Sequence, residues 1–155
     1  MTFVIEERPS GSGAVCQSIL AELPEWFGIP ASNADYARMA DQGPAFVAEA
    51  DGRTVGILVL KPHFEATVEV YLLAVRPQWH RSGVGGALIE RARQFALSRG
   101  AAYLTVKTRG PSAPYEPYER TRAFYQAKGF VALEEFIEIW GPENPCLFMV
   151  KAVTA

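Results

Sequence analysis

A glycine-rich turn is the segment of this sequence best suited to hold a ligand. His80-Arg81-Ser82-Gly83-Val84-Gly85 follows an apolar run and opens a stretch with helical spacing of apolar residues. A strand that passes through such a turn into a helix presents unpaired backbone N–H groups at the positive end of the helix dipole, which favours a phosphate. Gly83 and Gly85 carry no side chain, and Gly86 extends the opening, so a ligand could approach the main chain. The turn therefore predicts an anion site.

Two well-known phosphate-binding motifs differ from this segment. The P-loop ends in Gly-Lys-Ser/Thr, whereas Gly86 is followed here by Ala87. The dinucleotide fingerprint needs a third glycine at the position of Leu88. The alternative is that the glycines only form a tight connection between strand and helix. A lone Gly-x-Gly indicates this alternative about as often as it indicates a phosphate site.

The wider sequence around the turn adds a resemblance. The segment 73–88 resembles the acetyl-CoA signature of the GNAT superfamily of N-acetyltransferases, whose core pattern is Gln/Arg-x-x-Gly-x-Gly/Ala. A second family feature, an aromatic residue and a tyrosine followed by Gly-Phe, stands at Phe124-Tyr125-Gln126-Ala127-Lys128-Gly129-Phe130. The expected order of elements is also similar, so the likeness covers nearly the whole chain, although the N-terminal third matches in layout only. The sequence departs from the pattern at His80, where the family usually has Gln or Arg, and at Tyr118 and Thr121, which replace an asparagine and an alanine.

The resemblance implies that acetyl-CoA is the co-substrate. Backbone amides from Arg81 to Gly86 would hold its pyrophosphate, and main-chain groups at the end of the preceding strand would bond its pantetheine arm. Because backbone amides do most of this binding, His80 should weaken nothing essential. The residues expected to bind the cofactor are Leu73, Ala74, Val75, His80, Arg81, Ser82, Gly83, Val84, Gly85, Gly86 and Phe124.

Acyl transfer from a thioester to an amine also needs a base for the amine and an acid for the departing thiolate. Glu69 stands where several family members keep a glutamate base, and one ordered water could relay the proton to it. The alternative for Glu69 is a solvated carboxylate on a half-exposed strand, which is about as common an outcome as a catalytic base. The resemblance gives Tyr125 the role of general acid toward the CoA thiolate; its alternative is a core aromatic residue with its hydroxyl tied to the backbone.

Aromatic side chains are candidates for the acceptor pocket. The loop between the first two helices commonly covers the acceptor side in this superfamily, which makes Trp26, Phe27 and Tyr36 candidates, and Tyr118 belongs to a proline-rich connection beside the expected thioester end. Such aromatics more often pack a small core. Cys146 has no companion histidine by motif, so we expect a buried apolar thiol rather than a nucleophile. His63, after a proline, is expected at the surface.

The elements that must position these residues follow from periodicity and turn residues. Helical spacing, Gly and Pro breaks and runs of β-branched residues give the order β-α-α-β-β-β-α-β-α-β-β. Together with the resemblance this predicts an α/β (α+β) fold: a mixed, mostly antiparallel sheet of six to seven strands with about four helices. The resemblance also implies a V-shaped opening between the strand before the turn and the next strand. The expected strands are Phe3–Ile5, 45–50, 54–60, 67–75, 103–106, 131–140 and 146–153, and the expected helices cover 15–23, 33–39, 84–99 and 119–128.

Composition limits the classes of function. With 155 residues, 49% of them apolar, the chain is expected to form one domain over 1–155 with a core of its own. A net charge of −2 does not indicate nucleic acid or an anionic membrane as partner, and no apolar window approaches the about 18 residues of a membrane span. The two cysteines and two histidines do not have the spacing of metal ligands, so the sequence predicts no metal site. A reducing cytoplasm is the default location.

Two classes of function remain in competition. The first is an N-acetyltransferase that acts on the primary amine of a small molecule, with a protein N-terminus or lysine as the other acceptor. The second is a non-catalytic acyl-CoA-binding sensor, which has no chemical reason to keep Glu69 and Tyr125. Members of the superfamily often pair through their late strands, so the resemblance also implies a homodimer.

Overall fold

The computed structural model describes residues 2–154, and its elements follow the predicted order. In this part of the chain seven strands form one sheet in the order β1-β2-β3-β4-β5-β7-β6, with antiparallel pairing of β1 with β2, β2 with β3, β5 with β7 and β6 with β7. The predicted α/β class with a mostly antiparallel sheet is therefore confirmed. The elements are β1 (Val4–Arg8), α1 (Gly13–Leu20), α2 (Pro30–Gln42), β2 (Ala45–Ala50), β3 (Arg53–Pro62), β4 (Thr67–Val75), the 3₁₀ turn η1 (Pro77–Trp79), α3 (Val84–Ser98), β5 (Tyr103–Arg109), α4 (Glu116–Ala127), β6 (Val131–Phe136) and β7 (Cys146–Ala152).

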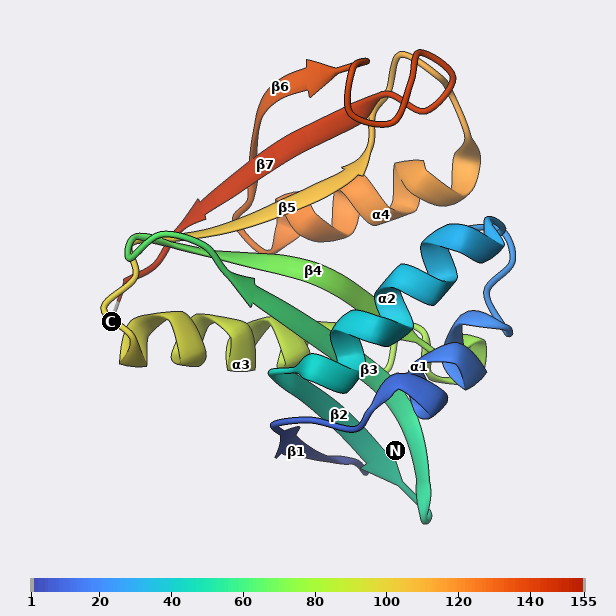
Figure 1. The fold of residues 1–155 in the computed structure, drawn as a ribbon, viewed down its shortest axis with the longest axis vertical. Helices are drawn as coiled ribbons and strands as arrows, with labels where there is room; N and C mark the ends of the chain where they lie inside the picture. The colour runs from blue at the N-terminus through green and yellow to red at the C-terminus, as the bar shows by residue number, and fades with distance from the viewer. Residues whose placement is uncertain (1, 155) are drawn as a thin grey trace. The chain divides into compact units, whose positions relative to one another are not determined.

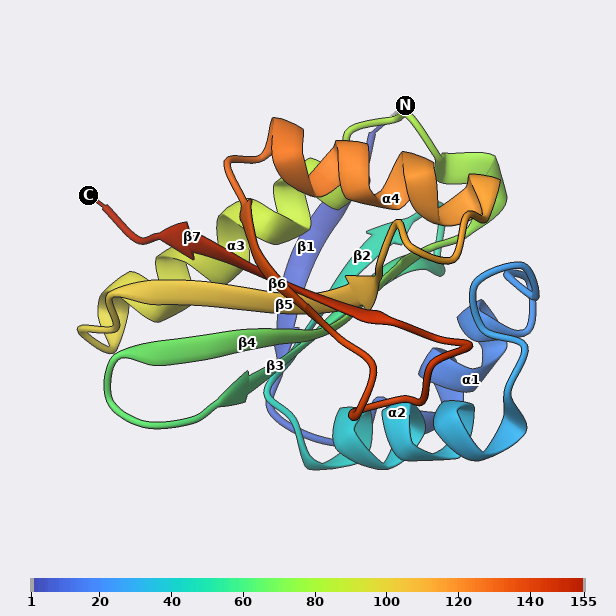
Figure 2. The ribbon, with the colours of Figure 1, turned by 90° about the horizontal axis from the view of Figure 1, so that it is seen from above.

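The chain divides into two compact units, of which the first holds the residues up to Lys61 together with Val70–Phe95. In this unit α1 and α2 cover one face of the strands and the start of α3 covers the other (Figures 1 and 2). Alternation along β2 and β3 explains the two layers, because Val47 and Ile57 pair across the strands and both belong to the cluster under α1 and α2. Gly56 permits α3 to approach closely, since a Cβ there would lie 2.9 Å from Val84 Cγ1.

The second unit holds Pro62–Glu69 and the residues from Ala96 onward. Here β7 lies between β5 and β6, and α4 lies along the β5–β7 pair (Figure 2). The buried face of α4 contributes Tyr125. The other buried apolar residues of this unit include Phe130, Leu104, Val106 and Met149. No helix within residues 2–154 is long and apolar enough to cross a membrane.

Several predicted boundaries were wrong, each for an identifiable reason. β1 continues to Arg8 because its polar half pairs with β2 as far as Ala45, although the apolar run stops at Ile5. β6 ends at Phe136 rather than at residue 140, because its partner β7 starts at Cys146, directly opposite Phe136. Similarly, β5 extends to Arg109, which pairs with the same Cys146.

Helix α4 begins at Glu116 instead of 119, so Tyr118 lies in the helix and not in the connection where it was expected. Pro117 occupies the first turn, where a missing N–H costs no helical hydrogen bond. Glu116 and Glu119 lie in the same turn and complement the positive end of the helix dipole.

Candidate active site

The glycine-rich turn connects β4 to α3, as the sequence predicts, but the connection differs from the prediction in one respect. The chain does not pass directly from β4 into the glycines: η1 intervenes, started by Pro77 and closed by a hydrogen bond from Trp79 N–H to Arg76 C=O. The helix α3 begins at Val84, as predicted, so Gly85 and Gly86 lie in its first turn. The free loop is therefore shorter than the glycine pattern indicates.

This turn fits an anionic ligand. Arg81 and Gly83 both have positive φ, at 60° and 89°, and alternate with Ser82; such alternation can aim successive N–H groups to one side. A Cβ at Gly83 would meet nothing within 4 Å, so the main chain is open there. The first described hydrogen bond that the start of α3 donates runs from Ala87 N–H to Gly83 C=O. The amides before Ala87 are thus the orphan donors of a helix N-terminus.

His80 folds back onto the strand that precedes the turn. Its Nε2 lies 2.7 Å from the carbonyl oxygen of Val75, and because a carbonyl only accepts, Nε2 carries the proton. The ring also meets Trp26 edge-on, with 5.9 Å between ring centroids. Leu73 and Val75 are half-buried, whereas Ala74 is buried. His80 thus tethers the turn to the end of β4, a role that the sequence did not indicate.

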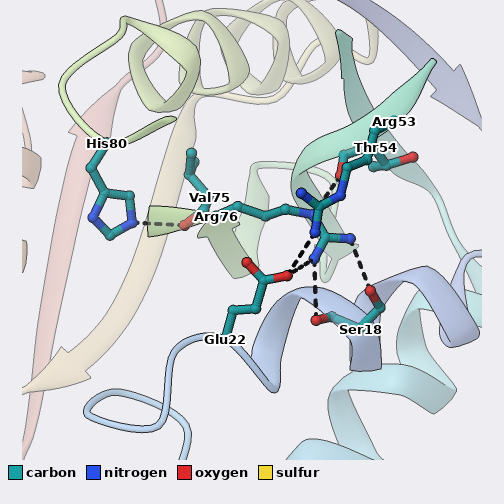
Figure 3. Close-up of polar contacts among 7 residues, drawn as sticks. All are labelled: Ser18, Glu22, Arg53, Thr54, Val75, Arg76 and His80. Carbon is teal, nitrogen blue, oxygen red and sulfur yellow. Dashed lines mark hydrogen bonds and ion pairs between the residues drawn. The ribbon is translucent and has the colours of Figure 1, made fainter. Parts of the chain in front are cut away.

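A second anchor at this strand end is Arg76, which sequence reasoning missed. Its side chain is 4% exposed and donates to Thr54 C=O at 2.7 Å, to Ser18 Oγ at 2.9 Å and to Ser18 C=O at 3.3 Å. Arg76 Nη1 also lies 2.5 Å from Glu22 Oε2, which accepts a further hydrogen bond from Arg53 at 2.9 Å. Figure 3 shows how this guanidinium joins β3 and α1 just before the turn. The only signal in the sequence is an arginine directly before Pro77.

The aromatic residues predicted to line the acceptor pocket pack against the hydrophobic core. Phe27 meets Tyr36 at 5.7 Å between ring centroids, and Tyr36 meets Tyr71 of β4 at 5.6 Å, both edge-on. These rings and Trp26 are half-buried and pack against the cluster under α1 and α2. Their packing role is therefore real, and each also keeps an exposed part that a ligand could contact. The structure adds Tyr71 to this group, which sequence reasoning did not include.

Tyr125 and Phe124 lie in the second unit, in the last turns of α4. Tyr125 is 5% exposed, and its ring meets those of Phe124 and Phe130, each at 5.3 Å between centroids. Phe124 is half-buried, with the ammonium of Lys128 5.8 Å from its ring centroid. Two edge-on contacts fix the direction of the phenol. Tyr118, earlier on the same helix, is half-buried and lies 6.1 Å from the ring of Tyr115.

Glu69 is buried, so the solvated-carboxylate alternative was wrong. Its side chain on β4 is 6% exposed, with Oε1 at 2.7 Å from His63 Nε2 and Oε2 at 3.3 Å from Lys107 Nζ. His63 lies in the turn between β3 and β4 and is exposed, as expected, but its ring is directed to the carboxylate. A buried carboxylate needs such partners, because burial without them is costly.

Both cysteine thiols are buried and held in the neutral form. Burial, aided by the charge of Asp41, raises the pKa of Cys16 from 9.0 to about 12. Burial also raises the pKa of Cys146, with Lys107 opposing the shift and Glu69 adding to it. Neither cysteine is a nucleophile at neutral pH, which agrees with the apolar thiol expected for Cys146.

Comparison with known proteins gives one family. The family model described as "Acetyltransferase (GNAT) domain" matches residues 41–132, more than half of the chain. A comparison with curated proteins finds no match. Among solved structures, a GNAT-family protein from Desulfovibrio desulfuricans superposes with a TM-score of 0.85 and 19% identity, over 99% of this chain and 100% of that one.

Two further solved structures share the fold and have named acceptors. An aminoglycoside 6'-N-acetyltransferase complexed with coenzyme A has a TM-score of 0.75 and 17% identity, covering 100% of this chain and 98% of that one. The ribosomal-protein-S18-alanine N-acetyltransferase from Escherichia coli has a TM-score of 0.74 and 17% identity, covering 99% and 96%.

Proposed function

Because the chain belongs to the GNAT family of acetyltransferases, we propose that it moves the acetyl group of acetyl-CoA directly to the primary amine of a small molecule. The observation that carries this proposal is the turn before α3, where the open main chain at Gly83 and the orphan amides of the helix suit a pyrophosphate. Acetyl-CoA is the co-substrate and supplies the activated thioester. The proposal takes the whole chain as one catalytic domain.

Proton transfer is assigned to two side chains. An ammonium group must lose a proton before its nitrogen attacks the thioester, and Glu69 takes that proton. As the C–S bond breaks, the phenol of Tyr125 gives its proton to the CoA thiolate. The burial of both side chains supports these roles. Hydrogen bonds are stronger where water is excluded, and they hold the acid and the base in position for proton transfer. The new amide nitrogen then returns a proton to the Tyr125 phenolate.

A small acceptor is supported by the aromatic group of Trp26, Phe27, Tyr36 and Tyr71. These rings are rigid because each packs against the core, and their exposed parts offer the flat apolar walls that small ligands use. The fold does not choose the acceptor, since one similar enzyme is named for an aminoglycoside and another for a ribosomal protein. We place Tyr118 of α4 among the residues that contact the acceptor.

Pairing of two copies through the late strands is part of the proposal. β6 is the outermost strand at its side of the sheet, and Val131 and Leu133 are 61% and 59% exposed. An exposed apolar edge is typical of an interface. Sedimentation velocity should show a dimer for the parent protein and a monomer for Leu133→Glu; a monomeric parent would contradict the pairing.

The experiment that tests the proposed function is release of CoA thiol from acetyl-CoA with a panel of acceptors. The panel contains aminoglycosides, polyamines, amino acids and peptides with free N-termini. We expect release with a small amine and a product that carries one more acetyl group. Release of CoA thiol with peptides alone would show that the acceptor is a protein and not a small molecule. Tight binding of acetyl-CoA without release of CoA thiol would favour a sensor.

A further inference from the structure

Arg109, the last residue of β5, carries a positive charge that pairs with no carboxylate among residues 2–154. Its side chain is half-buried, and its Nε is buried without a hydrogen-bond partner in this part of the chain. The guanidinium carbon lies 5.0 Å from the centroid of the Tyr115 ring. A buried donor without an acceptor costs free energy, so such a donor in a folded protein indicates a place where a ligand supplies the acceptor.

The guanidinium of Arg109 is held in place from two sides. Arg122 of α4 donates from Nη1 to the Arg109 C=O at 2.8 Å, which fixes the end of the strand. Tyr115, the residue before α4, places its ring beside the guanidinium, and an arginine that lies over a ring keeps the N–H groups at its edge for another partner. The planar fork of arginine matches a planar carboxylate, which it can bind through two parallel hydrogen bonds. Arg109 is therefore positioned to bind a carboxylate.

Two carboxylates of the second unit lie close to the end of β5, and both have other partners. Glu135 lies against Gly110, the residue after Arg109, and accepts hydrogen bonds from Ser112 N–H at 3.1 Å and from Ser112 Oγ at 2.8 Å. Glu69 lies 3.3 Å from the ammonium of Lys107, which balances its charge. The positive charge of Arg109 is thus available to a ligand.

Arg109 also lies on the face of β5 that holds the proposed base. Lys107 and Arg109 are two residues apart, so their side chains leave the same face of the strand, with about 7 Å between the Cα atoms. Lys107 contacts Glu69 on that face. Cys146 pairs with Arg109 in register, and besides burial the charges of Lys107 and Glu69 act on the pKa of its thiol. A small acceptor whose amine lies at Glu69 therefore has a free cation within reach of its other end.

We propose that Arg109 binds a carboxylate of the acceptor and that the acceptor is a free amino acid or another small amino carboxylate, an inference that rests on the proposed function. The amine of the acceptor lies at Glu69, and its carboxylate lies at the edge of the Arg109 guanidinium. Tyr118, which the proposed function places at the acceptor, has its ring centroid 6.1 Å from that of Tyr115. Arg109 contacts the substrate and no reacting atom, so it determines specificity and takes no part in proton transfer.

The test measures acetyl transfer by the intact chain to amino acids and to their amides. The pairs are glycine and glycinamide, leucine and leucinamide, and β-alanine and β-alaninamide, in which the amide keeps the amine and loses the negative charge. The ratio of kcat/KM within a pair is compared between variants, so the reactivity of each amine cancels. Arg109→Met should lower kcat/KM for the amino acid about 10–100-fold, mainly through a higher KM. The value for the amide should stay within about twofold of the parent value.

Two further variants separate the fork of Arg109 from its charge and from general electrostatics. Arg109→Lys keeps the charge without the fork, so its ratio should lie between those of the parent and Arg109→Met. Arg120→Met is the matched control, because it removes an arginine of the same unit whose side chain is 53% exposed and pairs with Glu116 at 3.0 Å. This variant should keep the parent ratio.

The outcomes distinguish a failure of this inference from a failure of the proposed function. An unchanged ratio in Arg109→Met, or an equal fall for the amino acid and its amide, overturns the carboxylate site alone. A parent that acetylates only amines without a carboxylate, or that prefers aminoalkyl phosphates to amino acids, also overturns it alone. A parent inactive with every acceptor of the wider panel overturns the proposed function as well.

A second measurement does not depend on turnover. Calorimetry in the presence of CoA gives the Kd of the product N-acetylleucine and of N-acetylleucinamide, which lacks the charge. The parent should bind N-acetylleucine about 10–100-fold more tightly than the amide, and Arg109→Met should bind the two about equally. Equal binding of the two products by the parent would overturn the carboxylate site.

Discussion

The most specific structural prediction concerns Arg76, which joins β4 to α1 and β3. Replacing it with methionine removes hydrogen bonds to Thr54 C=O, Ser18 C=O, Ser18 Oγ and Glu22 Oε2. At about 1 kcal/mol for each of the three neutral acceptors and about 1.5–3 kcal/mol for the carboxylate, the loss is about 4.5–6 kcal/mol. Two effects reduce this loss. The Glu22 side chain is 37% exposed, so water can hydrogen-bond its carboxylate in the variant, and the methionine side chain fills part of the space of the arginine. We therefore expect Arg76→Met to lower the free energy of unfolding by about 3 kcal/mol.

The measurement is urea unfolding, with the thermal midpoint as a second readout. For a chain of this length 3 kcal/mol corresponds to a fall in Tm of about 6–12 °C. The matched control is Arg53→Met, because Arg53 bonds the same Glu22 oxygen at 2.9 Å but has a side chain 52% exposed. An exposed pair of this kind contributes about 0.2–1 kcal/mol. Equal effects of the two substitutions, or a loss below about 1 kcal/mol for Arg76→Met, would refute the assigned network.

Three further predictions concern the acid, the turn and a buried thiol. Tyr125→Phe should lower kcat about 100-fold and leave the Kd for acetyl-CoA within about twofold by calorimetry; an unchanged kcat removes Tyr125 as the acid. Gly83→Ala and Gly100→Ala each place a Cβ at positive φ, 89° and 73°, with no atom within 4 Å. Both should lose about 1–2 kcal/mol of stability, but only Gly83→Ala should weaken acetyl-CoA binding, and equal binding would contradict the phosphate site. The Cys16 pKa of about 12 lies above its ordinary value of 9.0, so only the unfolded thiol ionises above pH 9.0 and stability falls by about 1.4 kcal/mol per pH unit. Urea unfolding across this range should give Cys16→Ala a shallower slope than the parent, and parallel slopes would count against the buried neutral thiol.

The fold was predictable where local signals agree with one another. The Gly-rich turn, the hairpin at Asp51-Gly52 and the helical spacing after Val84 each combine a turn residue with a periodic pattern. Boundaries failed where a partner strand decides the length, as at Arg8 and Phe136. The start of α4 could have been found, since Pro117 between two glutamates is typical of a first helical turn.

The site was predictable only in its backbone part. Amides at a turn depend on local sequence, whereas the partners of Arg76 lie 22–58 residues away in the chain and no pattern indicates them. The burial of Glu69 likewise depends on Lys107, which lies 38 residues away. His63 was within reach of sequence reasoning, because a hairpin turn after residue 62 brings positions 63 and 69 to adjoining strand ends.

The most direct test of the central claim follows the acetyl carbon itself. Acetyl-CoA labelled with ¹³C at the carbonyl is incubated with the protein and the best acceptor of the panel, and the carbonyl is followed by NMR. We predict that the thioester signal is replaced by that of an amide, with one CoA thiol released for each amide formed. A label that stays in the thioester with every acceptor, or that appears as acetate, would contradict the transfer of acetyl groups to an amine.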